Sequence, residues 1–293
     1  DSSWVRLLLG YVRDADSLTM AMQGVDYVIA TAAIKSVTIN AENPIEAVDV
    51  NVNGVFVTIK EAMRMKLEKC VFLSSDKAII GSAGADVYHA TKFIIERAVE
   101  WANRVSTVTR LACVRPCNFV PSSISVFERW YDEFKHTHPL SITDKRMIRY
   151  FVPIEYAATK TLEALELMQG GEVFVIPGKA FRLVDLVKHA HLQHKIVGLR
   201  TGEHRFREEL MTFDERKRAK RLRGMWVLYP VGAQPGPGVR SRIYPTAHIA
   251  KTCTVEVGRD CLIGDYALIA VDKLIMKDGA QINGHASITG GAH

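Results

Sequence analysis

The stretch Cys70-Val71-Phe72-Leu73-Ser74-Ser75-Asp76-Lys77 is followed, after a short loop, by Tyr88-His89-Ala90-Thr91-Lys92. The apolar start of the first stretch predicts a buried parallel strand, and the second opens a run with helical spacing. Tyr88 and Lys92 are four residues apart, so on a helix they share one face. An ammonium group beside a phenol favours the phenolate, and we therefore expect the pKa of Tyr88 to lie below its usual value of about 10. Such a phenolate takes a proton from a sugar or alcohol hydroxyl, although the same spacing is common on solvated helix faces.

The sequence on either side alternates between apolar runs and helical patterns. Strands are predicted at 5–10, 25–33, 70–75 and 107–117, and helices at 15–22, 44–65 and 87–103. Strand–helix alternation of this kind makes a parallel sheet that is covered on both faces. Right-handed crossovers then predict an α/β, doubly wound, Rossmann-like architecture.

Ordered matches to one known family run from about Val5 to about Pro230. The motifs that carry them include Val12-Arg13-Asp14, Ala32-Ala33-Ile34-Lys35, Asn51-Val52-Asn53-Gly54, Ser75-Asp76-Lys77-Ala78, Thr143-Asp144-Lys145-Arg146-Met147 and Gly198-Leu199-Arg200-Thr201-Gly202-Glu203. On these motifs the chain resembles the extended short-chain dehydrogenases/reductases of polysaccharide biosynthesis. Within them it is most similar to the inverting UDP-N-acetylglucosamine 4,6-dehydratases.

The resemblance implies a nicotinamide cofactor, NAD or NADP, a UDP-sugar substrate and no metal. Four residues are implied to be catalytic: Asp76, Lys77, Tyr88 and Lys92. The cofactor would be bound by Ala32, Ala33, Lys35, Asn51, Ser74, Tyr88 and Lys92. The substrate would be bound by Asn118, Arg146, Arg149, Arg200 and Glu203, since guanidinium groups suit phosphate.

The resemblance also assigns a role to each catalytic residue. Tyr88 would take the proton of the sugar 4-hydroxyl while hydride leaves C4, and Lys92 would bind the nicotinamide ribose. Lys77 would then remove the C5 proton, and Asp76 would protonate the departing 6-hydroxyl. Retaining relatives carry glutamate at the position of Lys77, so this lysine points to inversion at C5. A base of this kind needs a lowered pKa, which we expect from burial or neighbouring cations; the alternative is a capping aspartate beside a surface lysine.

The first strand and first helix are not joined by a Gly-x-Gly-x-x-Gly loop, which would seat a cofactor pyrophosphate. Compared with members of this family, the chain starts about where their third strand should be. We therefore expect the chain to be N-terminally truncated and to bind NAD(P) poorly. Tyr11 stands where the family usually has aspartate, and the loop before Tyr88 is a few residues longer than usual.

A second pattern follows residue 230. The Pro- and Gly-rich segment 231–242 predicts a linker between a domain at 1–230, whose substrate-binding part is about 118–230, and a segment at 243–293. In that segment Val257, Ile263, Ile269 and Ile275 recur every six residues. This period resembles the left-handed parallel β-helix of hexapeptide-repeat acyltransferases, whereas an alternating β-hairpin is the simpler alternative. His248 and His285 are candidate acyltransferase bases but are more readily explained as coil-surface histidines.

Composition narrows the other possibilities. The net charge is +6, with a basic run at 216–223. Asp214 and Glu215 precede this run, which favours a solvated helix over a nucleic-acid site. No apolar run reaches the length of a membrane span, no signal peptide opens the chain, and the five cysteines form no metal pattern. We expect a cytoplasmic protein with reduced thiols that forms a homo-oligomer.

Two other functions stay open at this point. A UDP-sugar 4-epimerase would share Tyr88 and Lys92 but would not need Asp76 and Lys77 for elimination. A non-catalytic binding or oligomerisation module would use neither pair.

Overall fold

The computed structural model describes residues 5–79, 86–123, 125–200 and 206–230. In the C-terminal part it describes 242–243, 247–250, 253–257, 262–263, 267–271, 273–276, 280–282 and 286–289. The chain divides into two compact units, Asp1–Leu228 and Tyr229–His293.

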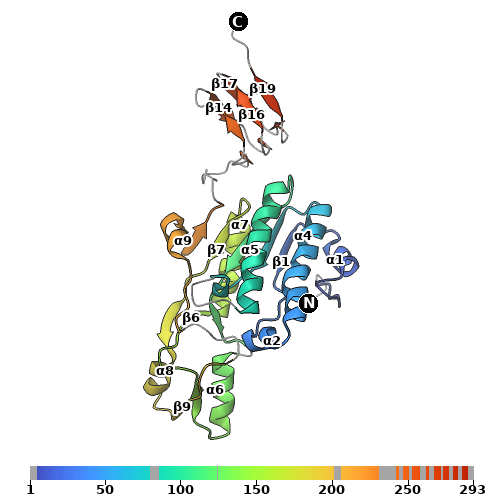
Figure 1. Ribbon diagram of the computed structural model, residues 1–293. Coiled ribbons are helices and arrows are strands. Elements are labelled where there is room, and N and C mark those ends of the chain that lie inside the picture. Colours follow the sequence, from blue (N-terminus) through green and yellow to red (C-terminus); the bar gives the residue numbers. More distant parts are fainter. Residues whose placement is uncertain are drawn as a thin grey trace. The chain divides into compact units, whose positions relative to one another are not determined.

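A six-stranded sheet forms the centre of the first unit (Figure 1). Its strands, in spatial order, are β1 (Tyr27–Ala30), β2 (Lys69–Leu73), β3 (Arg110–Arg115), β7 (Val173–Val175), β11 (Met225–Leu228) and β10 (Lys220–Leu222). The first four are parallel, and β11 and β10 are antiparallel additions. The middle strands are buried almost throughout, as expected for apolar runs covered on both faces. The predicted α/β fold with a parallel sheet is confirmed.

Helix α1 (Ala15–Met22) precedes β1, and further helices lie between the parallel strands. These are α2 (Val37–Glu42), α3 (Pro44–Val48), α4 (Gly54–Arg64), α5 (Val87–Val105) and α7 (Ile154–Leu167). The helix predicted at 44–65 is interrupted by a π-helical turn, Asp49–Asn53. Such turns often mark functional sites, and this one turns the Asn51 side chain inward, where it is 1% exposed.

The strand predicted at 5–10 is wrong. The segment is not part of any strand, and Leu7 and Leu9 are 90% and 103% exposed. Among the described residues, β1 pairs only with β2. An apolar run becomes a strand only where a neighbouring strand accepts and donates its backbone hydrogen bonds, and sequence pattern alone cannot supply that neighbour.

A smaller assembly follows β3 and carries part of the site. It contains the sheet β4 (Asn118–Val120), β6 (Ile148–Pro153) and β8 (Lys179–Arg182), and the pair β5 (Leu140–Ile142) and β9 (His194–Ile196). Helices α6 (Val126–Lys135) and α8 (Leu183–His189) pack with it around Trp130, Ile142 and Met147. This core holds β4 beside β6, so that Asn118 faces the end of the main sheet.

A buried ion network joins the main sheet to two helices. The Arg115 side chain on β3 donates to Glu96 of α5 at 2.9 and 2.6 Å and to Glu215 of α9 (Phe213–Arg218) at 2.9 Å. Arg115 and Glu96 are 1% and 2% exposed. The acidic first turn of α9 was expected to be solvated. This holds for Asp214 but is wrong for Glu215, because Arg115 draws that carboxylate into the interior.

We expect Arg115→Met to lower the free energy of unfolding by about 3–5 kcal/mol, because two carboxylates would stay buried without their cation. Urea unfolding measures the loss. The matched control is Arg110→Met on the same strand, whose partner Glu68 is half exposed and whose loss should cost about 0–1 kcal/mol. Equal effects of the two substitutions would contradict the assignment.

The second unit consists of short strands in three small sheets. They are β12 (Arg242–Ile243), β13 (His248–Ile249), β14 (Thr254–Val257), β15 (Leu262–Ile263), β16 (Leu268–Ala270), β17 (Lys273–Met276), β18 (Gln281–Ile282) and β19 (Ser287–Thr289). Strands that are three apart in chain order pair with each other, and every such pair is parallel: β12 with β15, β13 with β16, β14 with β17, β15 with β18 and β16 with β19. For these strands the parallel pairing excludes an antiparallel hairpin. The left-handed coil and the acyltransferase resemblance remain predictions.

The inward positions of this unit match the six-residue period only in part. Ile263 and Ile269 are completely buried, as predicted, but Ile275 is 59% exposed and Met276 is buried instead. One extra residue therefore enters the six-residue repeat before Met276, which reverses the sides of β17 because side chains alternate along a strand. The Val257 side chain and His285 lie outside the described residues, and His248 is exposed.

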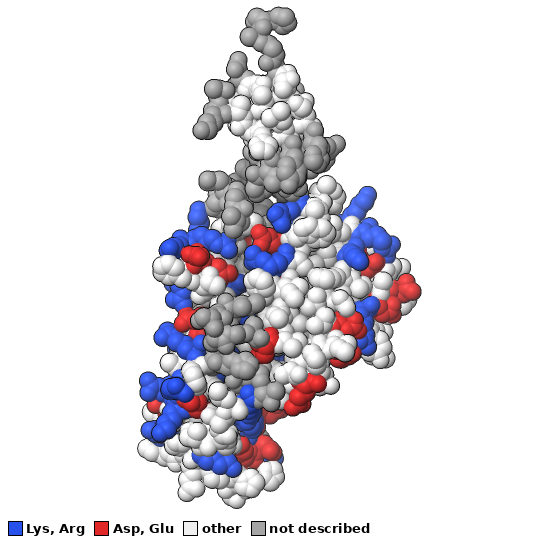
Figure 2. Space-filling view, viewed as in Figure 1, with Lys and Arg blue, Asp and Glu red and all other residues white. Residues whose placement is uncertain are grey.

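Basic residues gather around α9 and β10, where Figure 2 shows acidic side chains among them. Arg216 pairs with Glu209, and Arg223 pairs with Glu166. The basic run is thus partly neutralised by local ion pairs. In the part of the chain that the structure describes, no helix combines the length and apolarity needed to cross a membrane.

Candidate active site

The site begins where β2 ends. Past Leu73, the backbone N–H of Ser74 donates to Val114 at 2.7 Å and that of Asp76 donates to Pro116 at 2.9 Å. A 3-10 turn, Asp76–Ala78, follows, and the Ser75 hydroxyl accepts from its second N–H. The chain therefore presents Asp76 and Lys77 at the carboxyl end of a central parallel strand, the usual position for ligand-binding groups in such sheets.

Helix α5 brings the tyrosine and the second lysine to the same place. Asp86 caps the helix by accepting from the His89 N–H at 3.0 Å, and its other oxygen lies 2.8 Å from His89 Nδ1. Tyr88 and Lys92 lie on the buried face, as their spacing predicts. The Lys92 Nζ is 5.8 Å from the centre of the Tyr88 ring and donates to the Leu73 carbonyl at 2.9 Å.

The expected lowering of the pKa of Tyr88 by Lys92 is wrong for this state of the site. Burial raises the pKa of Tyr88 to about 12, although Lys77 and a hydrogen bond with Ser75 act in the opposite direction. Burial also lowers the pKa of Lys92 to about 8. Both shifts follow from one cause, since desolvation disfavours the charged form of either group.

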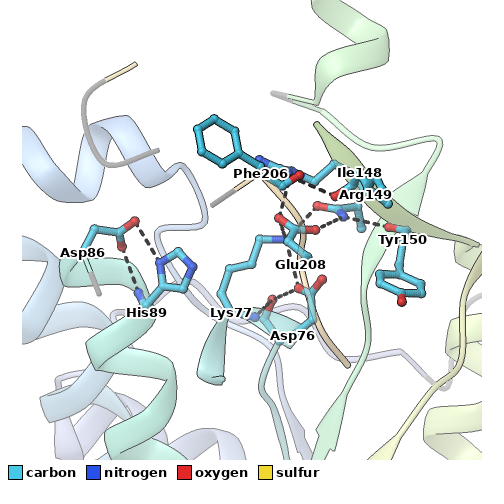
Figure 3. A network of polar contacts seen from close by, with 11 residues as sticks. Asp76, Lys77, Asp86, His89, Ile148, Arg149, Tyr150, Phe206 and Glu208 are labelled. Carbon is cyan, nitrogen blue, oxygen red and sulfur yellow. Dashed lines mark hydrogen bonds and ion pairs between the residues drawn. The ribbon is translucent and has the colours of Figure 1, made fainter. Parts of the chain in front are cut away.

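Lys77 lies in a cage of oxygen atoms (Figure 3). Its Nζ is 2.9 Å from Asp76 Oδ1, 3.0 Å from Asn118 Oδ1 and 2.7 Å from Glu208 Oε1. The Arg149 Nε lies 3.1 Å from the same oxygen of Glu208. Two cations and two carboxylates are thereby brought together, with Asn118 between them.

The charges of this cluster contradict the lowered pKa that we expected for Lys77. Burial acts to lower the pKa of Lys77, but the Asp76 and Glu208 carboxylates outweigh it and raise that pKa above its usual range. Burial raises the pKa of Asp76 to about 6 against the opposing effect of Lys77. Among the described residues, the buried Asp76 Oδ2 has no hydrogen-bond partner. The site thus holds a charged lysine beside a carboxyl group that can be protonated near neutrality.

A cleft of about 310 Å³ lies beside Lys92, along the carboxyl ends of β1 and β2. Its walls are mostly apolar and include Tyr11, Ala32 and Leu73. The carboxyl ends of the strands are where doubly wound sheets of this kind bind dinucleotides. Of the expected cofactor residues, Ala32 and Lys92 line the cleft.

The other expected cofactor residues have partners of their own. Lys35 Nζ donates to the Ser122 and Ser123 hydroxyls, each at 3.0 Å. The side-chain Oδ1 of Asn51 accepts from the Ile34 N–H at 2.8 Å. These contacts shape the chain that follows β1.

Two further expected cofactor residues lie nearby. Ser74 donates to Glu96 at 2.6 Å, which connects the end of β2 to the buried ion network of Arg115. Ala33 is half-buried in the segment after β1.

The expected substrate residues fall into two groups. Asn118 and Arg149 belong to the Lys77 cluster. Arg146 lies outside it, paired with Asp144 at 2.9 Å and stacked 3.7 Å from the centre of the Phe206 ring. Arg200 is half-buried, and Glu203 lies outside the described residues.

Sequence reasoning missed Glu208 and the Asp86–His89 pair. Asp86, just before the helical run, has the residue type and place of an N-cap, which could have identified it. Glu208 has no such signal, because it lies in a charged stretch typical of exposed loops and becomes 5% exposed only through its tertiary contacts.

Comparison with known proteins identifies the family of the chain. The family described as "Polysaccharide biosynthesis protein" matches residues 2–230. The inverting UDP-N-acetylglucosamine 4,6-dehydratase of Campylobacter jejuni is 35% identical over 207 residues, which are 68% of this chain and 60% of that protein. The UDP-glucose 4-epimerase of Rickettsia rickettsii is 30% identical over 227 residues, 75% of this chain and 65% of that protein.

The X-ray structure of Pen from Bacillus thuringiensis superposes with a TM-score of 0.72 at 33% identity, over 78% of this chain and 74% of that one. The chain spans less than two thirds of the dehydratase and epimerase relatives. The family match nevertheless covers nearly the whole first unit, including β2, α5 and the Lys77 cluster. The chain belongs to the polysaccharide biosynthesis protein family of extended short-chain dehydrogenases/reductases.

Proposed function

We propose that the chain provides the reaction centre of a nucleotide-sugar 4,6-dehydratase that acts on UDP-N-acetylglucosamine with inversion at C5. The observation that carries this proposal is the buried pair of Asp76 and Lys77, 2.9 Å apart, beside Tyr88 and Lys92. A dehydratase needs one acid and one base in addition to the oxidation residues. The similarity to the Campylobacter dehydratase supports the same choice.

Tyr88 takes the proton of the sugar 4-hydroxyl in this proposal. Its phenol is 7% exposed, and Lys77 and Ser75 are the neighbours that favour its ionised form. Lys92, anchored on Leu73, holds the cofactor ribose and faces the cleft. Bound in that cleft, NAD or NADP supplies a hydride acceptor for C4 and a hydride donor for C6.

Asp76 and Lys77 carry out the elimination. The neutral amine of Lys77 removes the C5 proton, and the protonated Asp76 gives its proton to the departing 6-oxygen, which leaves as water. Among the described residues, Oδ2 of Asp76 has no hydrogen-bond partner, which leaves this side of the carboxyl group open to the sugar. Asn118 keeps Lys77 in place, while Arg146, Arg149, Arg200 and Glu203 are the proposed contacts of the UDP moiety.

A UDP-sugar 4-epimerase is the second candidate, favoured by the epimerase relative. An epimerase would use Tyr88 and Lys92 but would leave the sugar's composition unchanged. Mass analysis of the product made by the complete natural protein from UDP-N-acetylglucosamine decides between them. Loss of water supports the dehydratase, and a product of unchanged mass overturns it in favour of the epimerase.

We expect the rate of water loss to be independent of pH above about 6 and to fall by about tenfold per pH unit below it. The active pair has Asp76 protonated and Lys77 neutral. Because the pKa of Asp76, about 6, lies below the raised pKa of Lys77, the fraction of this form is small but constant between the two values. Below about pH 6 both groups are protonated, and the active form is lost.

Single-turnover product formation, followed by mass analysis across the pH range, measures this profile. The control Asp132→Asn changes an exposed carboxylate on α6 and should leave the profile unchanged. A rate that falls as the pH rises through 6 would contradict a charged Lys77 in the resting site.

A further inference from the structure

Glu208 has no role in the chemistry described so far, yet it makes the shortest contact of Lys77. All three N–H groups of an ammonium can donate, and Lys77 directs them at Asp76, Asn118 and Glu208, with Glu208 at 2.7 Å. Lys77 and Glu208 are 9% and 5% exposed. An ion pair this well buried acts more strongly than a surface pair, because little solvent screens it.

Glu208 is itself held in place from two strands. Arg149 of β6 lies 3.1 Å from its Oε1, and the Asn118 amide of β4 donates to its Oε2 at 3.0 Å. The same amide donates to the Tyr150 carbonyl at 2.7 Å. The carboxylate is therefore fixed before any ligand arrives, and it fixes Lys77 in turn.

We propose that Glu208 is a positioning residue for the Asp76–Lys77 pair, which holds Lys77 in place as an ammonium ion and so limits how often it becomes a base. The consequence for catalysis rests on the proposed dehydratase function. The effect of Glu208 on the charge of Lys77 does not rest on that function, because the contacts between the two residues exist without substrate.

The proton that Lys77 must lose has a receiver within reach. Transfer from Lys77 Nζ to Asp76 Oδ1, across 2.9 Å, breaks one N–H bond and forms one O–H bond without changing the total charge. It produces the neutral amine and the protonated acid together. In the elimination the amine gains the C5 proton and the acid gives its proton to the leaving oxygen, so the ionic pair returns. Glu208 opposes the first transfer because it stabilises the ammonium form.

Few other groups can set the charge of Lys77. Among the described residues, the titratable or charged side chains that face it are Asp76, Tyr88, Cys117, Arg149 and Glu208. Burial raises the pKa of Tyr88 and of Cys117 to about 12, so both are neutral near pH 7. Arg149 acts to lower the pKa of Lys77. In the described part of the chain, Glu208 and Asp76 are thus the two groups that keep the ammonium charged.

The test is a titration of Lys77 in the whole protein, without substrate. Lysine labelled with ¹³C at Cε reports each amine by NMR, and the Lys77 signal is identified by its loss in Lys77→Arg. In Glu208→Gln, which keeps the size of the side chain, we expect the pKa of Lys77 to fall by at least about one unit, a tenfold change in proton affinity. The matched control is Glu209→Gln, the neighbouring carboxylate, which pairs with Arg207 and Arg216 and should leave Lys77 unchanged.

An unchanged Lys77 titration in Glu208→Gln, or an equal shift in Glu209→Gln, overturns the proposal. Glu208→Asp keeps the charge at a greater distance and should give an intermediate pKa, which also provides a second variant if the first does not fold. In the dehydration assay, Glu208→Gln should show a new loss of rate at alkaline pH, which a purely structural role would not produce. A shifted titration in a protein that never releases water would reject the dehydratase function and leave the role of Glu208 toward Lys77 standing.

Discussion

Tyr88→Phe is expected to lower turnover of the nucleotide sugar by about two to four orders of magnitude, the usual contribution of a general base. The substitution removes one oxygen and keeps the ring that packs at the start of α5. The phenol is buried, and its pKa is raised to about 12 by that burial. A water molecule would therefore have to replace it in a position that the fold closes to solvent.

Turnover by the complete natural protein and UDP-sugar affinity by calorimetry are the two measurements. Affinity should change little, because the lost group acts on a proton and not on the UDP moiety. Tyr131→Phe, an exposed tyrosine on α6, is the matched control. Undiminished turnover in Tyr88→Phe would remove this residue from the mechanism.

Lys77→Ala is expected to block the release of water while leaving proton removal from the 4-hydroxyl to Tyr88. Without the amine, nothing at this position takes the proton from C5, and the expected loss is again about two to four orders of magnitude. The substitution also leaves Asp76 and Glu208 buried close to each other without Lys77. We therefore expect a lower thermal stability at neutral pH than at acidic pH, where a proton can neutralise Asp76.

Incubation with UDP-N-acetylglucosamine in deuterated water tests the chemical step. The natural protein should give a dehydrated product with deuterium at C5 and inverted configuration there. Lys60→Ala, which alters an exposed lysine of α4, should behave like the natural protein. Retention at C5, or undiminished water loss in Lys77→Ala, would show that the base is a different residue.

Several helices and strands of the first unit could be predicted from the sequence, because each depends on the spacing of apolar residues within its own segment. The helix observed at Ala15–Met22 has the predicted bounds, and α5 begins at the predicted Val87. Apolar runs predicted β2 and β3 within a few residues, since strands buried on both faces need little beyond continuous hydrophobicity. The four-residue spacing of Tyr88 and Lys92 placed both on one helical face for the same reason.

Structural features that depend on a residue far away in the sequence could not be predicted from local patterns. The segment 5–10 has the composition of a strand but has no strand partner in the described structure, and Ile275 faces outward because one added residue reverses the sides of β17. The Ser75–Lys77 motif predicted the position of Lys77 but not its charge. That charge depends on Glu208, which is far along the chain and contacts Lys77 only in the folded protein. Helical and strand patterns are set by neighbours in sequence, whereas protonation in a buried site is set by neighbours in space, and only the tertiary structure brings those neighbours together.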